Sequence, residues 1–86
     1  MTDPLAPLRA KFIARCAEDL LVVQEGPAAS ELPRTIHRIA GVAGMFGYEA
    51  LGALAGRIDE RAHAGKGFVE RELAELAAAL AAVARS

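Results

Sequence analysis

Apolar residues recur every three or four positions in four separate stretches of the chain, which is the spacing of amphipathic helices. The first stretch follows Pro4 and Pro7, which a first helical turn tolerates. The four apolar stripes are Leu8, Phe12, Cys16, Leu20 and Val23; Leu32, Ile36, Ile39, Ala43 and Phe46; Leu51, Leu54, Ala55, Ile58 and Ala62; and Val69, Leu73, Leu76, Leu80 and Val83. The pattern therefore predicts four helices.

Glycine, proline and serine separate these stretches. Residues 26–30 read Gly-Pro-Ala-Ala-Ser, and Ser30 is placed to cap a second helix over about residues 31–46, with Pro33 in its first turn. Gly47 is positioned as the left-handed residue that ends this helix, and a Gly-Lys-Gly turn at 65–67 precedes the fourth. Connections this short place consecutive helices antiparallel. We predict an all-α fold, an antiparallel up-down-up-down four-helix bundle.

Length and composition agree with this fold. Eighty-six residues suffice for one small domain, so we expect a single domain over residues 1–86. Alanine and leucine together fill 30 positions and β-branched residues only 11, which favours helix over strand.

Charge and cysteine content narrow the classes of partner. Ten basic and eleven acidic side chains leave a net charge of -1, without the basic patch that nucleic-acid binding requires. The sequence has no apolar run of about 18 residues and no secretory signal pattern at its start. A single cysteine, Cys16, is typical of a reducing compartment. We expect a cytoplasmic monomer that binds neither nucleic acid nor membrane.

The second predicted helix carries a histidine on the side away from its core stripe. With residues placed at about 100° intervals around the axis, His37 stands about 140° from the centre of the stripe, Gly41 about 180° and Gly44 about 120°. Both glycines therefore lie beside the imidazole. Each costs on the order of 1 kcal/mol relative to alanine in an exposed helix interior, so a functional reason is expected.

We infer that the two glycines provide clearance. Bare backbone around His37 lets a large partner bring a reactive group up to a ring nitrogen. The alternative is that the glycines only ease helix packing and that His37 is an ordinary surface histidine. That alternative places the glycines toward the core, whereas the helical wheel places them opposite to it.

Histidine is suited to carrying a transferred group, because neutral imidazole is nucleophilic near neutral pH. Arg34, one turn before His37, and Arg38, the next residue, supply cations that can screen a phosphoryl group. The plain alternative for both arginines is a solvated surface. The sequence thus offers His37 as a candidate acceptor, with Arg34 and Arg38 as candidate phosphate-binding residues.

The segment 36–47, IHRIAGVAGMFG, resembles the signature of histidine-containing phosphotransfer (HPt) domains. In that family a phosphorylatable histidine is followed by glycine four and ten residues later, and then by a leucine-rich helix. His37, Gly41 and Gly47 match those positions. Further matches are Leu51, Leu54 and Ile58 in the following helix, with Asp59 and Glu60 where its closing acidic residue is usual. The motif spans residues 36–60, and the four-helix layout extends the similarity over nearly the whole chain.

The resemblance implies that His37 accepts a phosphoryl group from an aspartyl phosphate, or passes one to it, as the carrier of a two-component phosphorelay. The implied partner is the receiver domain of a response regulator or of a hybrid histidine kinase. Mg²⁺ is expected on that receiver, and no cofactor on this chain. One position departs from the family, which often has a lysine where this chain has Ala40. Our hypothesis is that Arg34 or Arg38 supplies that charge.

Residues around the end of the second helix have two possible roles. Tyr48 and Met45 either form an apolar rim for a partner or close the end of the bundle. We take Tyr48, together with Gly41 and Gly44, as a partner-binding candidate. Gly52 and Gly56 indicate close helix packing, or a share in the docking surface.

The second histidine and the cysteine are expected to be structural. His63 lies off the third stripe without a companion ligand, which predicts a surface histidine. Cys16 lies on the first stripe, as an inert packing residue does. A zinc site made of His37, His63 and Cys16 has no recognised spacing, so we expect no metal site.

The competing class is a helical adaptor, or a degenerate HPt-like module that binds receivers without being phosphorylated. An adaptor does not require an exposed histidine flanked by glycines. An enzyme is disfavoured, because the sequence shows no orienting carboxylate for His37, no oxyanion hole and no nucleotide-binding loop. We therefore expect a phosphoryl carrier rather than an independent catalyst.

Overall fold

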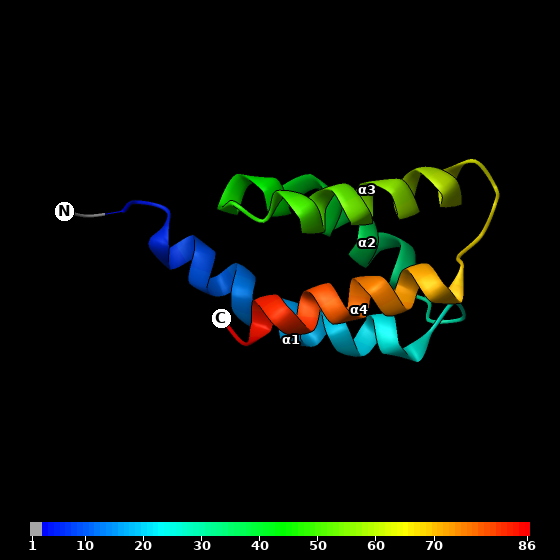
Figure 1. Cartoon of the computed structure of the whole chain (residues 1–86), viewed down its shortest axis with the longest axis horizontal. Coiled ribbons are helices and arrows are strands. Elements are labelled where there is room, and N and C mark those ends of the chain that lie inside the picture. The colour runs from blue at the N-terminus through cyan, green and yellow to red at the C-terminus, as the bar shows by residue number, and fades with distance from the viewer. Residues whose placement is uncertain (1–2) are drawn as a thin grey trace.

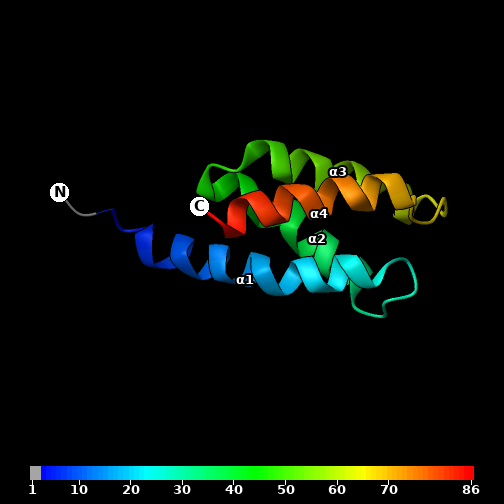
Figure 2. The same ribbon diagram turned by 60° about the horizontal axis from the view of Figure 1, so that its bottom comes forward.

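The computed structural model describes residues 3–86 (Figure 1). The helices of this part of the chain are α1 (Ala6–Glu25), α2 (Leu32–Val42), the short 3₁₀ helix η1 (Ala43–Phe46), α3 (Glu49–His63) and α4 (Glu70–Ala84). Consecutive α-helices run in opposite directions, so the predicted all-α up-down-up-down bundle is confirmed (Figures 1 and 2). Its principal extents are 46 × 21 × 19 Å, an elongated shape with the helices along the long axis.

The four apolar stripes meet in one core. α2 and η1 pack mainly against α3, and α1 packs mainly against α4. The largest fully buried side chains come from all four helices and belong to the predicted stripes: Cys16, Leu32, Ile36, Ile39, Ile58, Leu76 and Leu80. Burying each large aliphatic side chain contributes about 1.5–3 kcal/mol before the entropy of ordering is subtracted. The core thus fixes which side of α2 faces outward.

Two local predictions about the helix starts are wrong. Leu8 was assigned to the first stripe but is 50% exposed, because the first turns of α1 project beyond the end of α4 (Figure 2). Ser30 does not cap α2, whose cap position is Glu31 with no side-chain hydrogen bond. The Leu32 N–H donates to the Ala29 carbonyl instead, and Pro33 has no N–H to donate.

The second helix ends earlier in α-helical form than its pattern predicts. α2 stops at Val42, and residues 43–46 continue as 3₁₀ helix. Glycine weakens the α-helix here, with Gly44 inside η1 and Gly41 just before it. Gly47 takes the predicted left-handed conformation, at φ 90°, and its N–H donates to the Gly44 carbonyl. This turn directs the chain back into α3.

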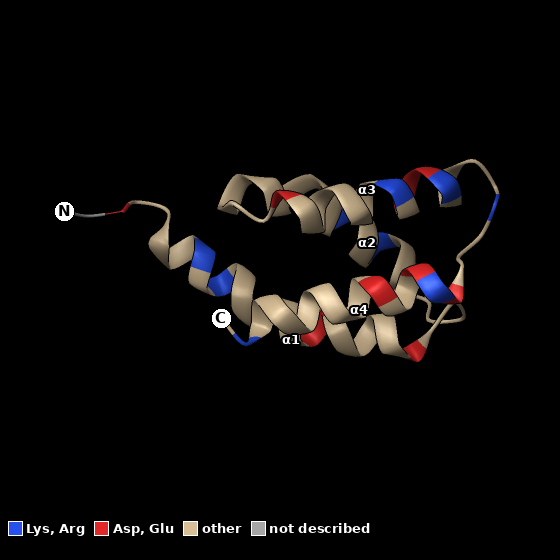
Figure 3. Cartoon of the chain, in the orientation of Figure 1, with Lys and Arg blue, Asp and Glu red and all other residues tan. Residues whose placement is uncertain are grey.

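Charged side chains of both signs gather in the second half of α3 and at the start of α4 (Figure 3). The described residues hold no helix that is both long enough and apolar enough to cross a membrane.

Candidate functional site

His37 stands on the outer side of α2, as predicted. Its side chain is 71% exposed, whereas its neighbours Ile36 and Ile39 are completely buried in the core. The helical period produces this contrast, because two buried isoleucines three residues apart fix the rotation of α2 about its axis. A large partner can therefore reach the imidazole from solvent.

The imidazole is held by a carboxylate of the neighbouring helix. His37 Nδ1 lies 2.9 Å from Oδ2 of Asp59 on α3, and the Asp59 side chain is 16% exposed. An ionised carboxylate only accepts hydrogen bonds, so this contact requires the proton on Nδ1. The lone pair of the neutral ring is then on Nε2. The expectation that His37 has no orienting carboxylate was wrong, because Asp59 comes from 22 residues further along the chain.

The backbone around His37 is open on both helices. A Cβ atom added at Gly41, Gly44 or Gly56 would meet nothing within 4 Å. Gly52 has a different surrounding, since a Cβ there would lie 3.5 Å from Ala43 Cβ and from Gly44 N. Gly52 therefore marks the close approach of α3 to η1, as small residues do in helix packing. Space for a partner is thus present at Gly41 and Gly44, where the helical wheel predicts it.

The two candidate arginines are in different surroundings. Arg34 is exposed on α2. Arg38 donates to Oδ1 of Asp19 on α1 at 2.5 Å, and the Asp19 side chain is only 3% exposed. Arg15 adds a second, longer contact to Asp19 at 3.6 Å. Arg38 therefore links α2 to α1. If Arg38 supplies the charge that is missing at Ala40, as our hypothesis allows, its guanidinium must leave Asp19 to bind the phosphoryl group.

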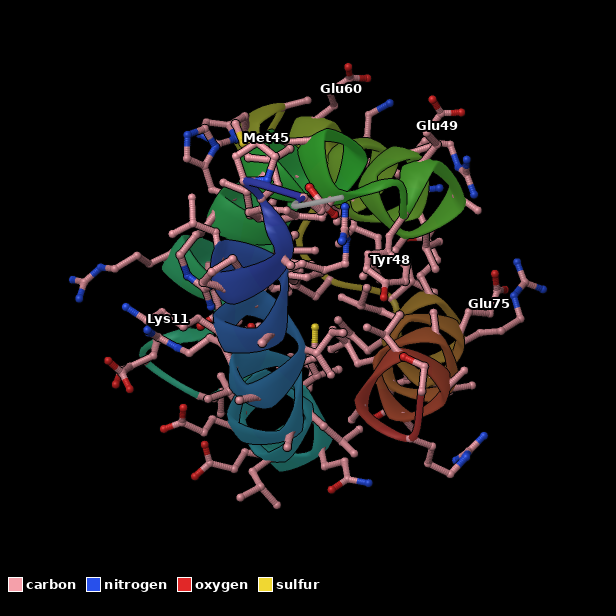
Figure 4. All side chains as sticks on the ribbon, turned by 90° about the vertical axis from the view of Figure 1, so that its left-hand side faces the viewer. Lys11, Met45, Tyr48, Glu49, Glu60 and Glu75 are labelled. Carbon is pink, nitrogen blue, oxygen red and sulfur yellow. The ribbon has the colours of Figure 1, made fainter. Side chains whose placement is uncertain are left out.

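Tyr48 lies at the end of the bundle and points toward its interior (Figure 4). The Tyr48 ring stacks on the Phe12 ring with centroids 5.7 Å apart. The Phe46 ring also packs against Phe12, with centroids 5.2 Å apart. Of the two roles considered for Tyr48, closing the bundle is the one that these contacts favour. Met45 is 63% exposed and contributes to the outer surface.

His63, which was expected to have no companion ligand, lies close to both His37 and Asp59. His63, one turn after Asp59 on α3, is exposed, and its ring centroid lies 5.9 Å from that of His37. His63 Nδ1 lies 2.8 Å from the Asp59 carbonyl oxygen and 3.4 Å from Asp59 Oδ1. The sequence showed the two histidines 26 positions apart, and only the pairing of α2 with α3 brings them together.

His37, Asp59 and His63 could hold a metal ion between them, since one ligand atom of each lies within 4.8 Å of the others. The prediction of no metal site did not include this group, because only the pairing of α2 with α3 brings Asp59 to the two histidines. Cys16, considered as a zinc ligand with the two histidines, is completely buried in the core instead. Burial raises the pKa of its thiol to about 11, and the Asp19 carboxylate adds to that rise. Cys16 is an inert packing residue, as predicted.

One of the comparisons with known proteins identifies a family. A family model described as "Hpt domain" matches residues 7–86, which is nearly the whole chain. No curated protein and no solved structure matches the chain.

Proposed function

The chain belongs to the Hpt domain family, whose members are phosphocarriers that exchange phosphoryl groups with receiver domains in two-component signalling, and we propose that it carries the phosphoryl group on Nε2 of His37. The donor or acceptor is the aspartate of a receiver domain, in a response regulator or a hybrid histidine kinase. The carrier acts in the cytoplasm.

One observation carries this proposal. The imidazole of His37 is exposed while its Nδ1 is held 2.9 Å from the Asp59 carboxylate. Fixing the proton on Nδ1 keeps the lone pair on Nε2, and this nitrogen is the nucleophile that the transfer needs. The open backbone at Gly41 and Gly44 supports the same reading, because a receiver must bring its aspartyl phosphate into line with that nitrogen.

The step is a displacement at phosphorus. The Nε2 lone pair of His37 forms the N–P bond while the P–O bond to the receiver aspartate breaks, and that bonding pair stays with the carboxylate. The imidazole, neutral before the step, becomes cationic and keeps its proton on Nδ1. The Asp59 carboxylate stabilises this positive charge from 2.9 Å. No proton has to leave, so the reverse step passes the group on to another receiver.

Charge on the phosphoryl oxygens is balanced from both proteins. On this chain Arg34 is the candidate, because it is exposed one turn from His37 and has no ion-pair partner among residues 3–86, whereas Arg38 pairs with Asp19. Mg²⁺ belongs to the receiver, together with its acidic cluster. A loose transition state needs positioning and charge neutralisation more than side-chain chemistry, so a small bundle with no cofactor of its own suffices as a carrier rather than a catalyst.

The test is phosphotransfer from a receiver phosphorylated with radioactive phosphate. We expect label on this chain that survives alkali and is lost in acid, as phosphohistidine is, and no label on His37→Gln. In the His63→Gln protein the label should still be present and acid-labile, because the acceptor nitrogen remains. Label on His37→Gln would contradict the proposal.

An unphosphorylated adaptor is the second candidate. Its favourable observation is the open strip of glycines, which a docking surface can use without any chemistry at His37. It predicts a stable complex with receivers, equal affinity for His37→Gln, and no label under any condition. Binding measured on the same proteins separates the two functions.

A further inference from the structure

The group His37, Asp59 and His63 is made of the donors that late first-row transition metals prefer. Two imidazoles and one carboxylate suit Zn²⁺ and its neighbours, whereas Mg²⁺ requires oxygen ligands. One ligand atom of each residue lies within 4.8 Å of the others. The three side chains lie on the surface formed by α2 and α3, so a metal ion has free access from solvent.

The ligand atoms are near enough to converge on one zinc ion after small rotations of the side chains. Tetrahedral zinc with bonds of about 2.0–2.1 Å needs donor atoms about 3.4 Å apart. In the structure His37 Nδ1 is hydrogen-bonded to Asp59 Oδ2 at 2.9 Å, and His63 Nδ1 lies 3.4 Å from Asp59 Oδ1, so an ion bound at these nitrogens displaces their protons. Because the ligand atoms lie within 4.8 Å of one another, no pair has to close by more than about 1.4 Å, and both rings are exposed, at 71% and 70%.

The spacing along the helices supports the same site. Asp59 and His63 are four residues apart on α3, which places them on one side of the helix. His37 faces them from α2 across the interface between the two helices. Three protein ligands leave a fourth position for water, the arrangement of an open zinc site.

We propose that His37, Asp59 and His63 bind one divalent transition-metal ion, with Zn²⁺ as the representative, and that the bound ion blocks phosphorylation of His37. The second half of this inference rests on the proposed function. Neutral imidazole has one nitrogen with a lone pair, and the other carries the proton. A metal on either nitrogen of His37 therefore takes the lone pair that attack on phosphorus needs. Metal and phosphoryl group compete for the same residue.

Metal binding is tested first, without any receiver. Chelator-treated protein is titrated with ZnCl₂, by calorimetry and by imidazole NMR. We expect one ion per chain, with the His37 and His63 resonances shifting together and no shift with MgCl₂. His63→Gln and Asp59→Asn should each weaken binding by at least about tenfold, because each removes a ligand.

Glu60→Gln is the matched control, since Glu60 is an exposed carboxylate next to Asp59 that points away from the bundle (Figure 4). It should bind zinc as the unaltered chain does. Equal zinc affinity in all four proteins would overturn the site, as would an absence of binding at millimolar zinc.

Inhibition is then measured as the transfer rate with equimolar zinc divided by the rate without it. We expect this ratio to fall well below one for the unaltered chain and for Glu60→Gln, and to return toward one for His63→Gln. Equal ratios for all three would mean that zinc acts on the receiver, which overturns the regulatory half. A chain that takes label but binds no zinc leaves the proposed function standing without the site. A chain that binds zinc but takes no label has the site without the proposed function.

Discussion

Two adjacent residues of α2, His37 and Arg38, are each held by one aspartate, and the two pairs differ in almost every other respect. Arg38 reaches Asp19 on α1, a side chain that is 3% exposed, while His37 reaches Asp59 on α3 at the surface. Asp19 has a further oxygen, Oδ2, that is buried and has no hydrogen-bond partner among the described residues. In the His37–Asp59 pair the imidazole ring is exposed, and the backbone beside it at Gly41 and Gly44 is free of side-chain contacts.

Burial decides what each pair can do. Charges taken out of water cannot be separated cheaply, so the Arg38–Asp19 pair is a fixed link between α1 and α2. An exposed pair contributes at most about 1 kcal/mol to stability, so His37–Asp59 can open for a partner at little cost. The difference predicts that Asp19 stabilises the fold and that Asp59 supports the chemistry of His37. Each of the following changes tests that division.

The largest expected effect is on transfer, from Asp59→Asn. The variant keeps the size of the side chain but removes the charge that stabilises the imidazolium formed on transfer. We expect the rate to fall by about 10- to 100-fold, by analogy with the loss of the carboxylate behind a metal-bound histidine, with unfolding free energy changed by less than about 1 kcal/mol. Rapid-quench transfer and urea denaturation measure the two quantities.

Asp59 acts through His37, so its role must also appear in the ring itself. Imidazole ¹⁵N shifts should show less Nδ1–H tautomer at His37 in Asp59→Asn, and Asp59→Glu should restore part of the rate. Glu60→Gln is the control and should leave both unchanged. A full rate in Asp59→Asn would remove Asp59 from the mechanism.

The second change is Asp19→Ala, where the expected effect is on stability. It leaves Arg38, which is 30% exposed, without its partner inside the bundle. We expect the free energy of unfolding to fall by about 2 kcal/mol, less than for a fully buried pair because Arg38 can turn to water. Transfer at a temperature where the variant is folded should stay within about twofold. Glu18→Ala, at an exposed neighbour, controls for the loss of a carboxylate. Slowed transfer without lost stability would reverse the roles of the two aspartates.

The third change, Gly41→Leu, fills the open space beside His37 without touching either aspartate. A larger side chain should obstruct the receiver and slow transfer by about tenfold, while stability stays equal or rises by up to about 1 kcal/mol because leucine favours helix. Ala82→Leu, at an exposed position of α4, is the matched control. Equal transfer by both variants would show that clearance at Gly41 is irrelevant.

The smallest expected effect concerns the core beside Asp19. Burial raises the pKa of the Cys16 thiol from 9.0 to about 11, so the unfolded chain loses this proton first as pH rises. Stability from the protonated thiol is complete below about pH 9 and is lost between pH 9 and 11. Urea denaturation over that range should show a steeper decline for the unaltered chain than for Cys16→Ala. Parallel declines would contradict the raised pKa.

The sequence predicts what depends on a single helix. The stripes, the outward direction of His37 and the left-handed turn at Gly47 follow from residues within a few positions of one another, and the structure has them, with Leu8 of the first stripe as an exception. The family signature also names Asp59, but only as a motif position. The direction of Asp59 also follows from the sequence of a single helix, because Gly52, Gly56 and Asp59 are spaced four and three apart on one side.

Contacts between helices could not be predicted in the same way. The pairs His37–Asp59 and Arg38–Asp19 join residues 22 and 19 positions apart, and they depend on how far each helix is shifted along its neighbour. That shift is set by packing such as Gly52 against Ala43, not by periodicity. The proximity of His63 to His37 depends on the same shift, and so does the pairing of Arg38 with Asp19.

The most direct measurement is the position of phosphorus on the ring. Protein with ¹⁵N-labelled histidine is phosphorylated by a receiver, and ¹⁵N–³¹P coupling identifies the bonded nitrogen. If Asp59 holds the Nδ1 proton as the 2.9 Å contact indicates, phosphorus couples to Nε2 of His37 while Nδ1 keeps its hydrogen. Coupling to Nδ1, or to either nitrogen of His63, would contradict the assignment.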